Sequence, residues 1–315
     1  MTIQPPMVFD DAAIQSIIGK IDMRTALVGM FRALAGGSAT QPAQTLSLFP
    51  HDGGDFITYL GVLASEKVFG AKLSPYIPGD GKALVTAWTV LMSMETGAPL
   101  LLCDSKRLTT ERTAATTALA VDLLARKNAG ILTVVGTGAV GLAHLRHAEG
   151  VRPWREVRLC SPSAGRKPGL PDKLADGTPV VTFTDADKAA SGADVVMLCT
   201  SSGTPVIDVG RLPGGVLVTS ISTNVANARE IDPAALSGLD VYCDYRATTP
   251  ASAGEMKLAA AAGTWSADCL LGDLPELVTG RATLPSRTRP AFFRSIGLGL
   301  EDIAAAAAVL AAART

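Results

Sequence analysis

The stretch ILTVVGTGAVG at residues 131–141 joins a short β-branched run to a glycine-rich turn, after which the chain continues with helix-forming residues. In a strand–turn–helix unit, the first glycine of GxGxxG permits a tight turn and the second lets the backbone approach a pyrophosphate. The third lets the helix pack closely on the strand. The positive end of that helix then meets the anionic phosphates. We predict that this stretch binds a dinucleotide, with a purely structural glycine turn as the alternative. The residues of the turn predicted to bind the cofactor are Gly136, Thr137, Gly138, Ala139, Val140 and Gly141.

From this turn toward the C-terminus, strand-like runs alternate with helical segments. The runs lie at residues 156–160, 180–183, 194–200, 216–220 and 241–244. Alternation of this kind is typical of a parallel, doubly wound sheet. The tail, residues 291–313, is rich in alanine, and we predict that it is helical and packs on the N-terminal part of the chain.

The N-terminal part has a different pattern. Apolar residues at helical spacing predict two packing helices, and five strand-like runs follow without a helical segment between them. This favours a mostly antiparallel meander. The helices are predicted at residues 11–18 and 23–34, and the strands at 45–49, 56–64, 68–76, 84–94 and 100–103. A long, largely buried helix, capped by Thr109 or Thr110, is then predicted to run through Leu124.

Composition narrows the class of protein. A chain of 315 residues is longer than one hydrophobic core usually serves, so we expect two lobes. A net charge of −1 gives no bias toward nucleic acid or an anionic membrane. The first residues lack a secretory signal, and the apolar tract at 303–312 is shorter than the roughly 20 residues that span a bilayer. We therefore expect a soluble, cytoplasmic protein.

The cysteines and histidines do not indicate a metal site. The five cysteines form no CxxC pair and are interpreted as small core residues. His144 and His147 share a helix face, but no nearby carboxylate or cysteine completes a ligand set.

The choice between NAD and NADP depends on the residues after the second strand. In NAD-preferring proteins of this fold, an acidic residue about 20 positions past the glycines binds the ribose hydroxyls. Here residues 159–167 read LCSPSAGRK, without a carboxylate. Ser161, Ser163, Arg166 and Lys167 favour a 2′-phosphate, and hence NADP; the alternative is that the two cations are solvated loop charges. The remaining residues predicted to bind the cofactor are Thr113, Thr200, Ser201 and Ser202.

Two cations in the N-terminal part are candidate substrate ligands. Lys72 stands in an otherwise apolar strand, where an ammonium needs an anion or a solvated cleft. The alternative is a lysine that faces outward at an alternating position. Arg112 falls in the first turn of the predicted long helix, where the macrodipole disfavours a cation unless it holds a carboxylate. The alternative there is a surface arginine paired with Glu111.

With these features, the chain resembles the ornithine cyclodeaminase/mu-crystallin family over nearly its full length. The resemblance is carried by the glycine turn together with GAK at 70–72, ETGAP at 95–99, LTTERTAA at 108–115, GDL at 272–274, FRSIG at 293–297 and ED at 301–302. It implies an α/β fold in which a Rossmann dinucleotide-binding domain is inserted in an α+β substrate-binding and dimerisation domain. We expect residues 1–126 to form the substrate-binding and dimerisation domain, 127–286 the NAD(P)-binding domain, and 287–315 a helix that returns to the first domain.

The resemblance also implies a bound NADP or NAD and an amino or imino acid substrate whose carboxylate is held by an arginine, the strand lysine and the arginine of the long helix. The last two correspond to Lys72 and Arg112, whereas Gln44 stands at the first position and brings no charge. The catalytic aspartate of ornithine cyclodeaminases corresponds to Asn224, and an amide cannot accept a proton from a substrate amine. Cyclodeamination is therefore disfavoured.

These residues predict an NAD(P)H-dependent reductase of ketimines such as 1-pyrroline-2-carboxylate, or the reverse amino-acid dehydrogenase. Lys72 would donate the proton, Arg112 would fix the carboxylate, and Asn224 would occupy the position of the family's catalytic acid. The alternatives are ornithine cyclodeaminase, which converts ornithine to proline and ammonia, and a non-catalytic NADPH or small-molecule binding protein. The resemblance further implies a homodimer formed through the first lobe.

Overall fold

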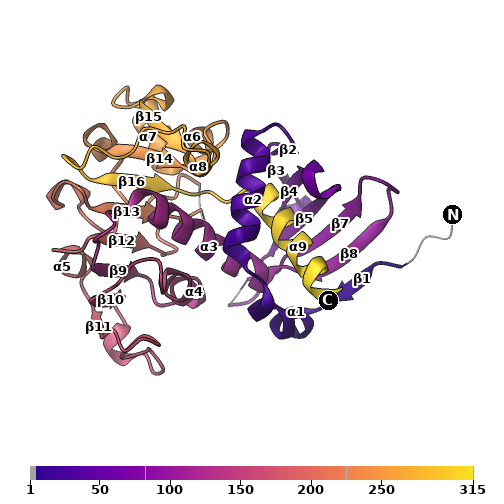
Figure 1. Cartoon of the computed structure of the whole chain (residues 1–315), viewed down its shortest axis with the longest axis horizontal. Coiled ribbons are helices and arrows are strands. Elements are labelled where there is room, and N and C mark those ends of the chain that lie inside the picture. Colours follow the sequence, from indigo (N-terminus) through magenta and orange to yellow (C-terminus); the bar gives the residue numbers. More distant parts are fainter. Residues whose placement is uncertain (1–4, 82, 224–225, 315) are drawn as a thin grey trace. The chain divides into compact units, whose positions relative to one another are not determined.

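A computed structural model describes residues 5–81, 83–223 and 226–314, and the chain divides into two units (Figure 1). Unit 1 consists of Met1–Arg112 with Leu298–Thr315, and unit 2 is Thr113–Gly297. The first boundary lies inside the long helix α3 (Lys106–Leu124), earlier than the predicted boundary after residue 126. The second lies after residue 297 rather than 286, because the strand β16 (Ala291–Arg294) belongs to the sheet of unit 2.

Unit 1 is built on a sheet with the spatial order β1-β8-β7-β5-β4-β2, in which β3 also pairs with β4 and β6 with β5. The pairs β4–β5, β5–β7 and β7–β8 are antiparallel, which confirms the predicted meander. An unpredicted N-terminal strand, β1, pairs in parallel with β8. The strands are β1 (Met7–Phe9), β2 (Ala39–Thr40), β3 (Thr45–Leu48), β4 (Asp55–Leu63), β5 (Val68–Ile77), β6 (Leu84–Val85), β7 (Trp88–Ser93) and β8 (Pro99–Asp104).

Helices cover one face of this sheet. The helices α1 (Asp11–Ile17) and α2 (Met23–Ala35) lie between β1 and β2 in the chain, and α9 (Gly299–Ala313) contacts β4, β5 and β7. The close approach of α9 depends on glycines: a Cβ on Gly299 would lie 2.4 Å from the Leu60 carbonyl oxygen, and one on Gly61 would lie 2.8 Å from the Leu300 Cα. The first turn of α9 therefore lies directly on β4.

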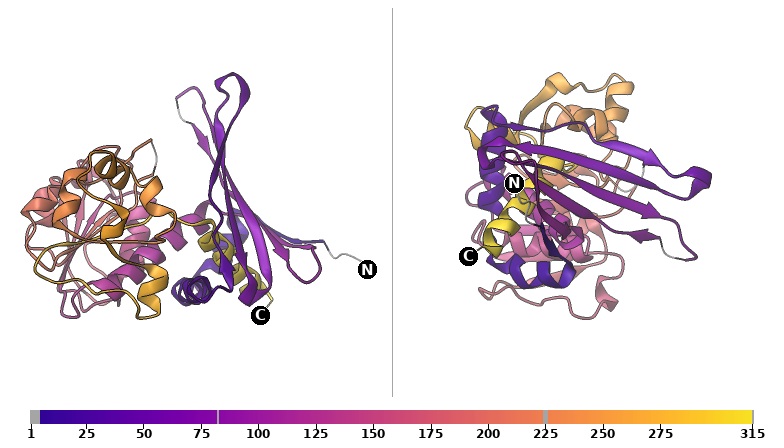
Figure 2. Two further views of the ribbon diagram at one scale, coloured as in Figure 1. Left: turned by 90° about the horizontal axis from the view of Figure 1, so that it is seen from above. Right: turned by 90° about the vertical axis from the view of Figure 1, so that its right-hand side faces the viewer.

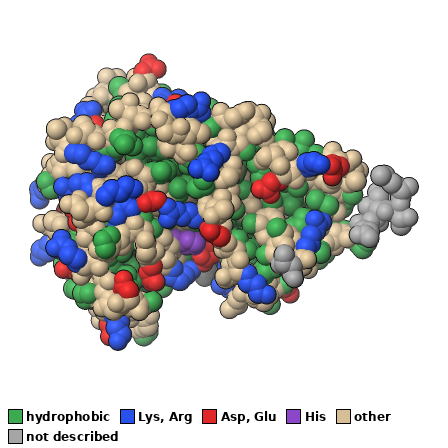
Figure 3. All heavy atoms as spheres, in the orientation of Figure 1, with side chains coloured by type: hydrophobic (Ala, Val, Ile, Leu, Met, Phe, Trp, Pro, Cys, Tyr) green, Lys and Arg blue, Asp and Glu red, His purple; other side chains and the backbone are tan. Residues whose placement is uncertain are grey.

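The opposite face of the sheet carries apolar side chains that no helix within the described residues of unit 1 covers. Successive strand residues point to opposite faces, so Lys72 of β5 points to the covered face while its neighbour Leu73 points away. The right-hand view in Figure 2 looks onto the uncovered face, and hydrophobic side chains reach the surface over unit 1 in Figure 3. The exposed apolar residues on this face are Val8, Leu60, Phe69, Leu73, Trp88 and Leu102.

Unit 2 contains a parallel sheet with the order β11-β10-β9-β12-β13-β16-β14-β15, which confirms the predicted doubly wound fold. Its strands are β9 (Ile131–Val135), β10 (Glu156–Cys160), β11 (Val180–Phe183), β12 (Val195–Leu198), β13 (Leu217–Ser220), β14 (Asp240–Cys243), β15 (Leu270–Asp273) and β16. Its shorter helices are α4 (Ala139–Ala148), α5 (Ala186–Ala190), α6 (Thr249–Ser252), α7 (Gly254–Ala261) and α8 (Leu274–Val278). No helix in the described part of the chain is long and apolar enough to cross a membrane.

Three predicted elements are wrong in their extent. The strand predicted at residues 84–94 is two strands, β6 and β7, both of which pair with β5. The tail is not helical throughout, because residues 291–294 form β16 between β13 and β14, where Phe292 and Phe293 are fully buried. The long helix starts at Lys106 rather than after Thr109 or Thr110, since the Thr109 amide already donates to the Ser105 carbonyl oxygen. The charged residues at its start hid the first turn from a prediction based on apolar spacing.

The glycine turn lies between β9 and α4, as predicted. Gly136 has φ +119°, a left-handed conformation that disfavours side chains, and a Cβ there would lie 2.4 Å from the Cys199 carbonyl oxygen. A Cβ on Gly141 would lie 1.9 Å from the Gly136 carbonyl oxygen. By contrast, a Cβ on Gly138 would have no neighbour within 4 Å among the described atoms. Packing within unit 2 thus requires the first and third glycines but leaves open space at the second.

We predict that Gly136→Ala lowers the free energy of unfolding by about 1–3 kcal/mol, because alanine is strained at this φ and clashes with the next strand. Gly138→Ala is the matched control, and its effect should stay within about 0.5 kcal/mol. Urea denaturation monitored by circular dichroism measures both values. Equal losses for the two variants would show that packing does not distinguish the glycines.

Candidate functional site

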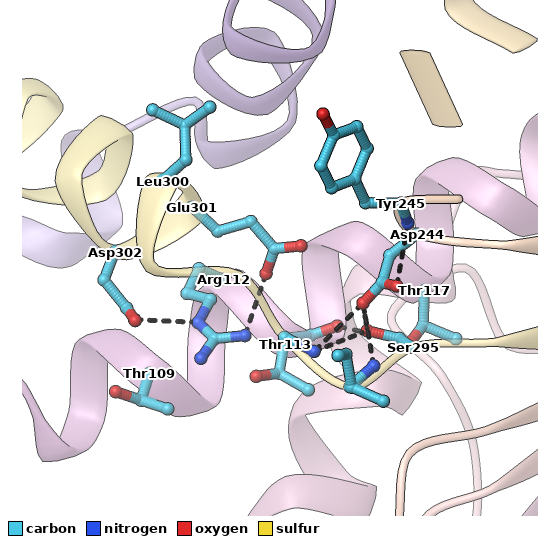
Figure 4. Close-up of polar contacts among 12 residues, drawn as sticks. Thr109, Arg112, Thr113, Thr117, Asp244, Tyr245, Ser295, Leu300, Glu301 and Asp302 are labelled. Carbon is cyan, nitrogen blue, oxygen red and sulfur yellow. Dashed lines mark hydrogen bonds and ion pairs between the residues drawn. The ribbon is translucent and has the colours of Figure 1, made fainter. Parts of the chain in front are cut away.

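Unit 1 contains a group of four buried charged residues, which we call the charged cluster. It consists of Lys72, Arg112, Glu301 and Asp302. The Lys72 Nζ lies 2.7 Å from the Asp302 Oδ2, and the two side chains are 3% and 2% exposed. The Arg112 Nε lies 2.9 Å from the Asp302 Oδ1, and its Nη1 lies 2.8 Å from the Glu301 Oε2. Figure 4 shows the guanidinium between the two carboxylates.

Three elements bring these residues together. Lys72 lies on the covered face of β5, opposite Tyr59 of β4, and the two carboxylates lie in the first turn of α9, where a helix favours acidic residues. Arg112 lies in the second turn of α3, because that helix begins at Lys106. The predicted position in the first turn is therefore wrong, and the helix dipole is not what makes this arginine unusual. Its partners are the α9 carboxylates.

The surroundings of Lys72 favour proton transfer near neutral pH. Its Nζ lies 3.4 Å from the Thr109 Oγ1 and 4.1 Å from the centre of the Tyr59 ring. Burial lowers the pKa of Lys72 to about 8, although the Asp302 carboxylate opposes this shift. Lys72 is therefore a buried ammonium with a carboxylate partner rather than an outward-facing surface lysine.

Arg112 stays charged. Burial opposes its charge, but the carboxylates of Asp302 and Glu301 outweigh that effect and raise the pKa of Arg112 above its usual range. Its Nη2 makes no hydrogen bond or ion pair within the residues that the structure describes. This nitrogen is a donor to which a further carboxylate can bind.

A pocket of about 640 Å³ in unit 1 falls in the size range of small-molecule sites, and the described residues that line it do not include the four members of the charged cluster. It shares Thr109 with the surroundings of Lys72. Its other lining residues are Ser74, Ala83, Leu84, Val85, Thr86, Ala87 and Lys106. Gln44, the remaining predicted substrate ligand, is half-buried directly before β3, and its role stays a prediction.

In unit 2, the residues around the glycine turn fit an anionic dinucleotide. Gly138 precedes α4 without a side-chain cap, so the first N–H groups of the helix are available to phosphate oxygens at the place where a Cβ would meet nothing. Ala139 and Val140 form the first turn of that helix. The Thr137 Oγ1 lies 3.0 Å from the Ser161 Oγ, and Lys167 donates to the Thr137 carbonyl oxygen.

The cations after β10 are placed at the same end of the sheet. Ser163, Arg166 and Lys167 are exposed in or beside a short turn that follows β10, and the hydrogen bond of Lys167 to Thr137 ties this turn to the glycine turn. In an open parallel sheet, ligands bind outside the carboxyl ends of the strands. The predicted NADP-binding residues therefore lie where the ribose end of a dinucleotide is expected.

A buried carboxylate that the sequence analysis missed joins two further loops. The Glu230 Oε1 accepts hydrogen bonds from the Thr200 amide (2.8 Å) and Thr200 Oγ1 (2.6 Å). Its Oε2 accepts from the Ser220 hydroxyl and from the amides of Ile221 and Ser222 at 2.8–3.2 Å. Glu230 is fully buried and belongs to no motif, so only its spatial neighbours reveal it.

The structure describes three of the other residues of unit 2 predicted to belong to the site, but not the fourth. Ser202 donates its amide to the Thr200 Oγ1, and Ser201 is exposed next to it. The Thr113 carbonyl oxygen accepts from the Thr117 hydroxyl within α3. Asn224 lies outside the described residues, so its role stays a prediction.

The His144 ring is a hydrogen-bonded core group. Its Nδ1 is hydrogen-bonded to the Val140 carbonyl oxygen (2.8 Å) and its Nε2 to the Thr117 Oγ1 (3.0 Å). The described residues contain no group of His, Cys, Asp and Glu side chains arranged to hold a metal ion.

A second buried carboxylate fixes the end of unit 2. Asp244, at the end of β14, accepts hydrogen bonds from the Ser295 hydroxyl (2.9 Å) and from the amides of Ile296 (2.7 Å) and Gly297 (3.0 Å) (Figure 4). It also accepts from the Thr249 hydroxyl. The FRSIG segment is therefore held in place before the chain continues into α9.

Comparison with known proteins identifies the family. Residues 6–315 match the model of the ornithine cyclodeaminase/mu-crystallin family, and the chain belongs to this family, which confirms the resemblance. It is 50% identical over 309 residues to the NAD(P)H-dependent anabolic L-arginine dehydrogenase DauB of Pseudomonas aeruginosa, with 98% of each protein covered.

Solved structures agree with this fold. The iminosuccinate reductase of Paracoccus denitrificans in complex with NAD⁺ is 25% identical and superposes with a TM-score of 0.87 over 99% of this chain and 97% of the other. The Δ¹-pyrroline-2-carboxylate reductase of Thermococcus litoralis in complex with NADH and L-proline is 22% identical, with a TM-score of 0.87 over 98% and 97%.

Proposed function

We propose that this chain is an NAD(P)H-dependent oxidoreductase that reduces the C=N bond of an α-imino acid, and in reverse oxidises the α-amino acid. The observation that carries the proposal is the buried pair of Lys72 and Arg112, a proton donor and a carboxylate ligand in one cluster. The glycine turn of unit 2, with open space at Gly138, supports a dinucleotide. The NAD(P)H-dependent dehydrogenase at 50% identity supports the same chemistry.

Each residue has a defined role in this reaction. A bound NADPH or NADH supplies the hydride that reduces the imine carbon. Lys72 holds the proton that the imine nitrogen receives, and its lowered pKa lets the ammonium both exist at neutral pH and give the proton up. The Nη2 of Arg112 binds the substrate carboxylate, and this fixes the distance from the reacting carbon to the proton donor.

The relatives support one substrate class for this proposal. The 50% identity to an L-arginine dehydrogenase favours a linear α-imino acid, formed from a 2-oxo acid and ammonia, over a cyclic ketimine such as 1-pyrroline-2-carboxylate. Ornithine cyclodeamination is the alternative reaction; it would release ammonia without net use of NADPH. A non-catalytic binding protein would hold the same ligands without turnover.

The uncovered face of the unit 1 sheet supports a homodimer. A contiguous row of exposed apolar side chains on a sheet marks a protein interaction surface. A second copy of this chain presents the same face and covers it symmetrically. We propose that the dimer forms through this face.

We predict that Lys72→Ala lowers kcat for imine reduction by roughly 10²–10⁴-fold, the usual contribution of a general acid. Arg112→Ala should mainly raise KM, because it removes the carboxylate ligand.

In wild-type protein, the kcat of reduction should fall as the pH rises through about 8, where Lys72 loses its proton. Stopped-flow absorbance with NADPH and a panel of 2-oxo acids plus ammonia, and of cyclic imino acids, measures all three. The surface variant Lys67→Ala is the control; ornithine converted to proline and ammonia without NADPH change would contradict the reaction.

We predict that NADPH is preferred over NADH. Arg166→Ala should weaken NADPH binding roughly tenfold or more and leave NADH binding nearly unchanged, because it removes one charge-assisted contact to the 2′-phosphate. Arg166→Ala combined with Lys167→Ala should weaken NADPH more, but it should also weaken NADH because Lys167 holds the Thr137 carbonyl oxygen. Fluorescence titration with each cofactor is the measurement, with the exposed Lys188→Ala as control. Equal losses for both cofactors in Arg166→Ala would refute the preference.

We predict a dimer in solution that Leu73→Asp disrupts, since this substitution places a charge on the uncovered face, where Leu73 is 45% exposed. Val181→Asp is the matched control, because Val181 is 44% exposed on a strand of unit 2. Light scattering at micromolar concentration should give a dimer for wild type and Val181→Asp, and a monomer for Leu73→Asp. A monomeric wild type, or a dimer in all three, would count against this interface.

A further inference from the structure

We propose that Asp302 is the positioning residue of the site: it contacts both cations and holds the Lys72 ammonium charged and fixed relative to Arg112, whereas Glu301 makes its ion pair with Arg112. The inference rests on the proposed imine reduction. It is based on which cations the two carboxylates contact. Asp302 binds Lys72 through Oδ2 (2.7 Å) and Arg112 through Oδ1 (2.9 Å), while Glu301 pairs with Arg112 at 2.8 Å.

A carboxylate that contacts both cations can hold them at a fixed distance from each other. Two buried cations repel each other; without an anion both would move toward solvent, and burial would favour loss of the proton from the lysine. One carboxylate with an oxygen on each cation fixes the spacing between the ammonium and the guanidinium. Catalytic groups need to be held within about 0.5 Å of their working geometry by neighbours that are themselves fixed.

The position of Asp302 is itself fixed by the start of α9. The Leu300 amide donates to the Gln41 Oε1 at 2.9 Å. The contacts of Gly299 and Gly61 leave no room between this turn and β4. Asp302 is therefore held on a rigid turn rather than on a mobile loop.

Titratable groups face Lys72 from β4, β8, α3 and α9, and their charges determine how strongly its ammonium is favoured. Tyr59 of β4 and Cys103 of β8 are neutral at pH 7, because burial, assisted by the Asp302 charge, raises the pKa of both, that of Cys103 to about 11. Arg112 of α3 is charged and disfavours the ammonium, whereas Glu301 and Asp302 of α9 favour it. Asp302 is the anion in direct contact, so it is the main group that keeps Lys72 protonated against burial.

The test compares Asp302→Asn with Glu301→Gln, two neutral replacements of buried carboxylates one residue apart. The titration of Lys72 is followed by NMR with ¹³Cε- and ¹⁵Nζ-labelled lysine, and the Lys72 signal is assigned by its absence in Lys72→Met. Asp302→Asn should lower the titration midpoint of Lys72 by about 1–3 pH units, and Glu301→Gln should lower it by clearly less. This measurement does not depend on activity.

The same variants have distinct kinetics. Asp302→Asn should reduce kcat for imine reduction at pH 7 by on the order of tenfold, as the protonated fraction of Lys72 falls, and should move the alkaline limb of the pH profile by the same shift as the NMR midpoint. Glu301→Gln should act mainly on KM through Arg112. Asp302→Glu keeps the carboxylate but lengthens the side chain, so it should retain the titration midpoint of Lys72 and lower kcat. If circular dichroism shows that Asp302→Asn does not fold, Asp302→Glu still tests the inference.

An unchanged Lys72 midpoint in Asp302→Asn, or equal shifts in the two neutral variants, overturns the inference. A wild-type protein that reduces no α-imino acid overturns the proposed function instead, and the NMR titration still decides whether Asp302 controls the charge of Lys72.

Discussion

The structure of unit 1 depends on the burial of two cations and two carboxylates in one place. Moving ions out of water costs several kcal/mol each, and close pairing of opposite charges can offset that cost. Lys72, Arg112, Glu301 and Asp302 meet this condition with contacts of 2.7–2.9 Å. The partners of Arg112 lie 189 and 190 residues away in the sequence. Unit 1 therefore needs both ends of the chain, and the C-terminal helix must return to the sheet for the cations to be buried at all.

Unit 2 contains the buried ion pair of Arg294 and Glu255, but it stabilises two other buried carboxylates in a different way. Glu230 and Asp244 accept hydrogen bonds from backbone amides and hydroxyls, so fixed dipoles rather than cations balance their charges. Each one joins segments that follow parallel strands, at the carboxyl ends of the strands, where such folds bind ligands. Glu230 holds the start of the segment that leads to Asn224. The charged cluster of unit 1 thus balances its carboxylates with cations, whereas Glu230 and Asp244 of unit 2 are held by hydrogen bonds.

Local patterns in the sequence predicted the parts of the structure that local physics determines. The glycine turn, the parallel strands and the meander each follow from spacing within about ten residues. The two errors have different causes. Residues 291–294 form a strand because they lie between two other strands, which only tertiary contacts decide. The long helix starts a turn earlier than predicted because its first turn is charged and has no apolar spacing. The sequence singled out Lys72 and Arg112, but pairing across 190 positions leaves no local signal, so Glu301 and Asp302 appeared only as part of a family resemblance.

The charge balance of the cluster also bears on the direction of the reaction. With equal numbers of cations and carboxylates, the cluster has no surplus positive charge for a substrate carboxylate, and the anchoring contact falls to the one guanidinium nitrogen that the α9 carboxylates leave open. When Lys72 gives its proton to an imine nitrogen, the cluster gains a net negative charge that favours a protonated amine product beside it. Reduction therefore needs Lys72 to regain a proton in each cycle, and oxidation of the amino acid needs it to start without one. Because burial places the pKa of Lys72 at about 8, the two directions draw on protonation states that are both accessible near neutral pH, and a modest rise in pH shifts the site from reduction toward oxidation.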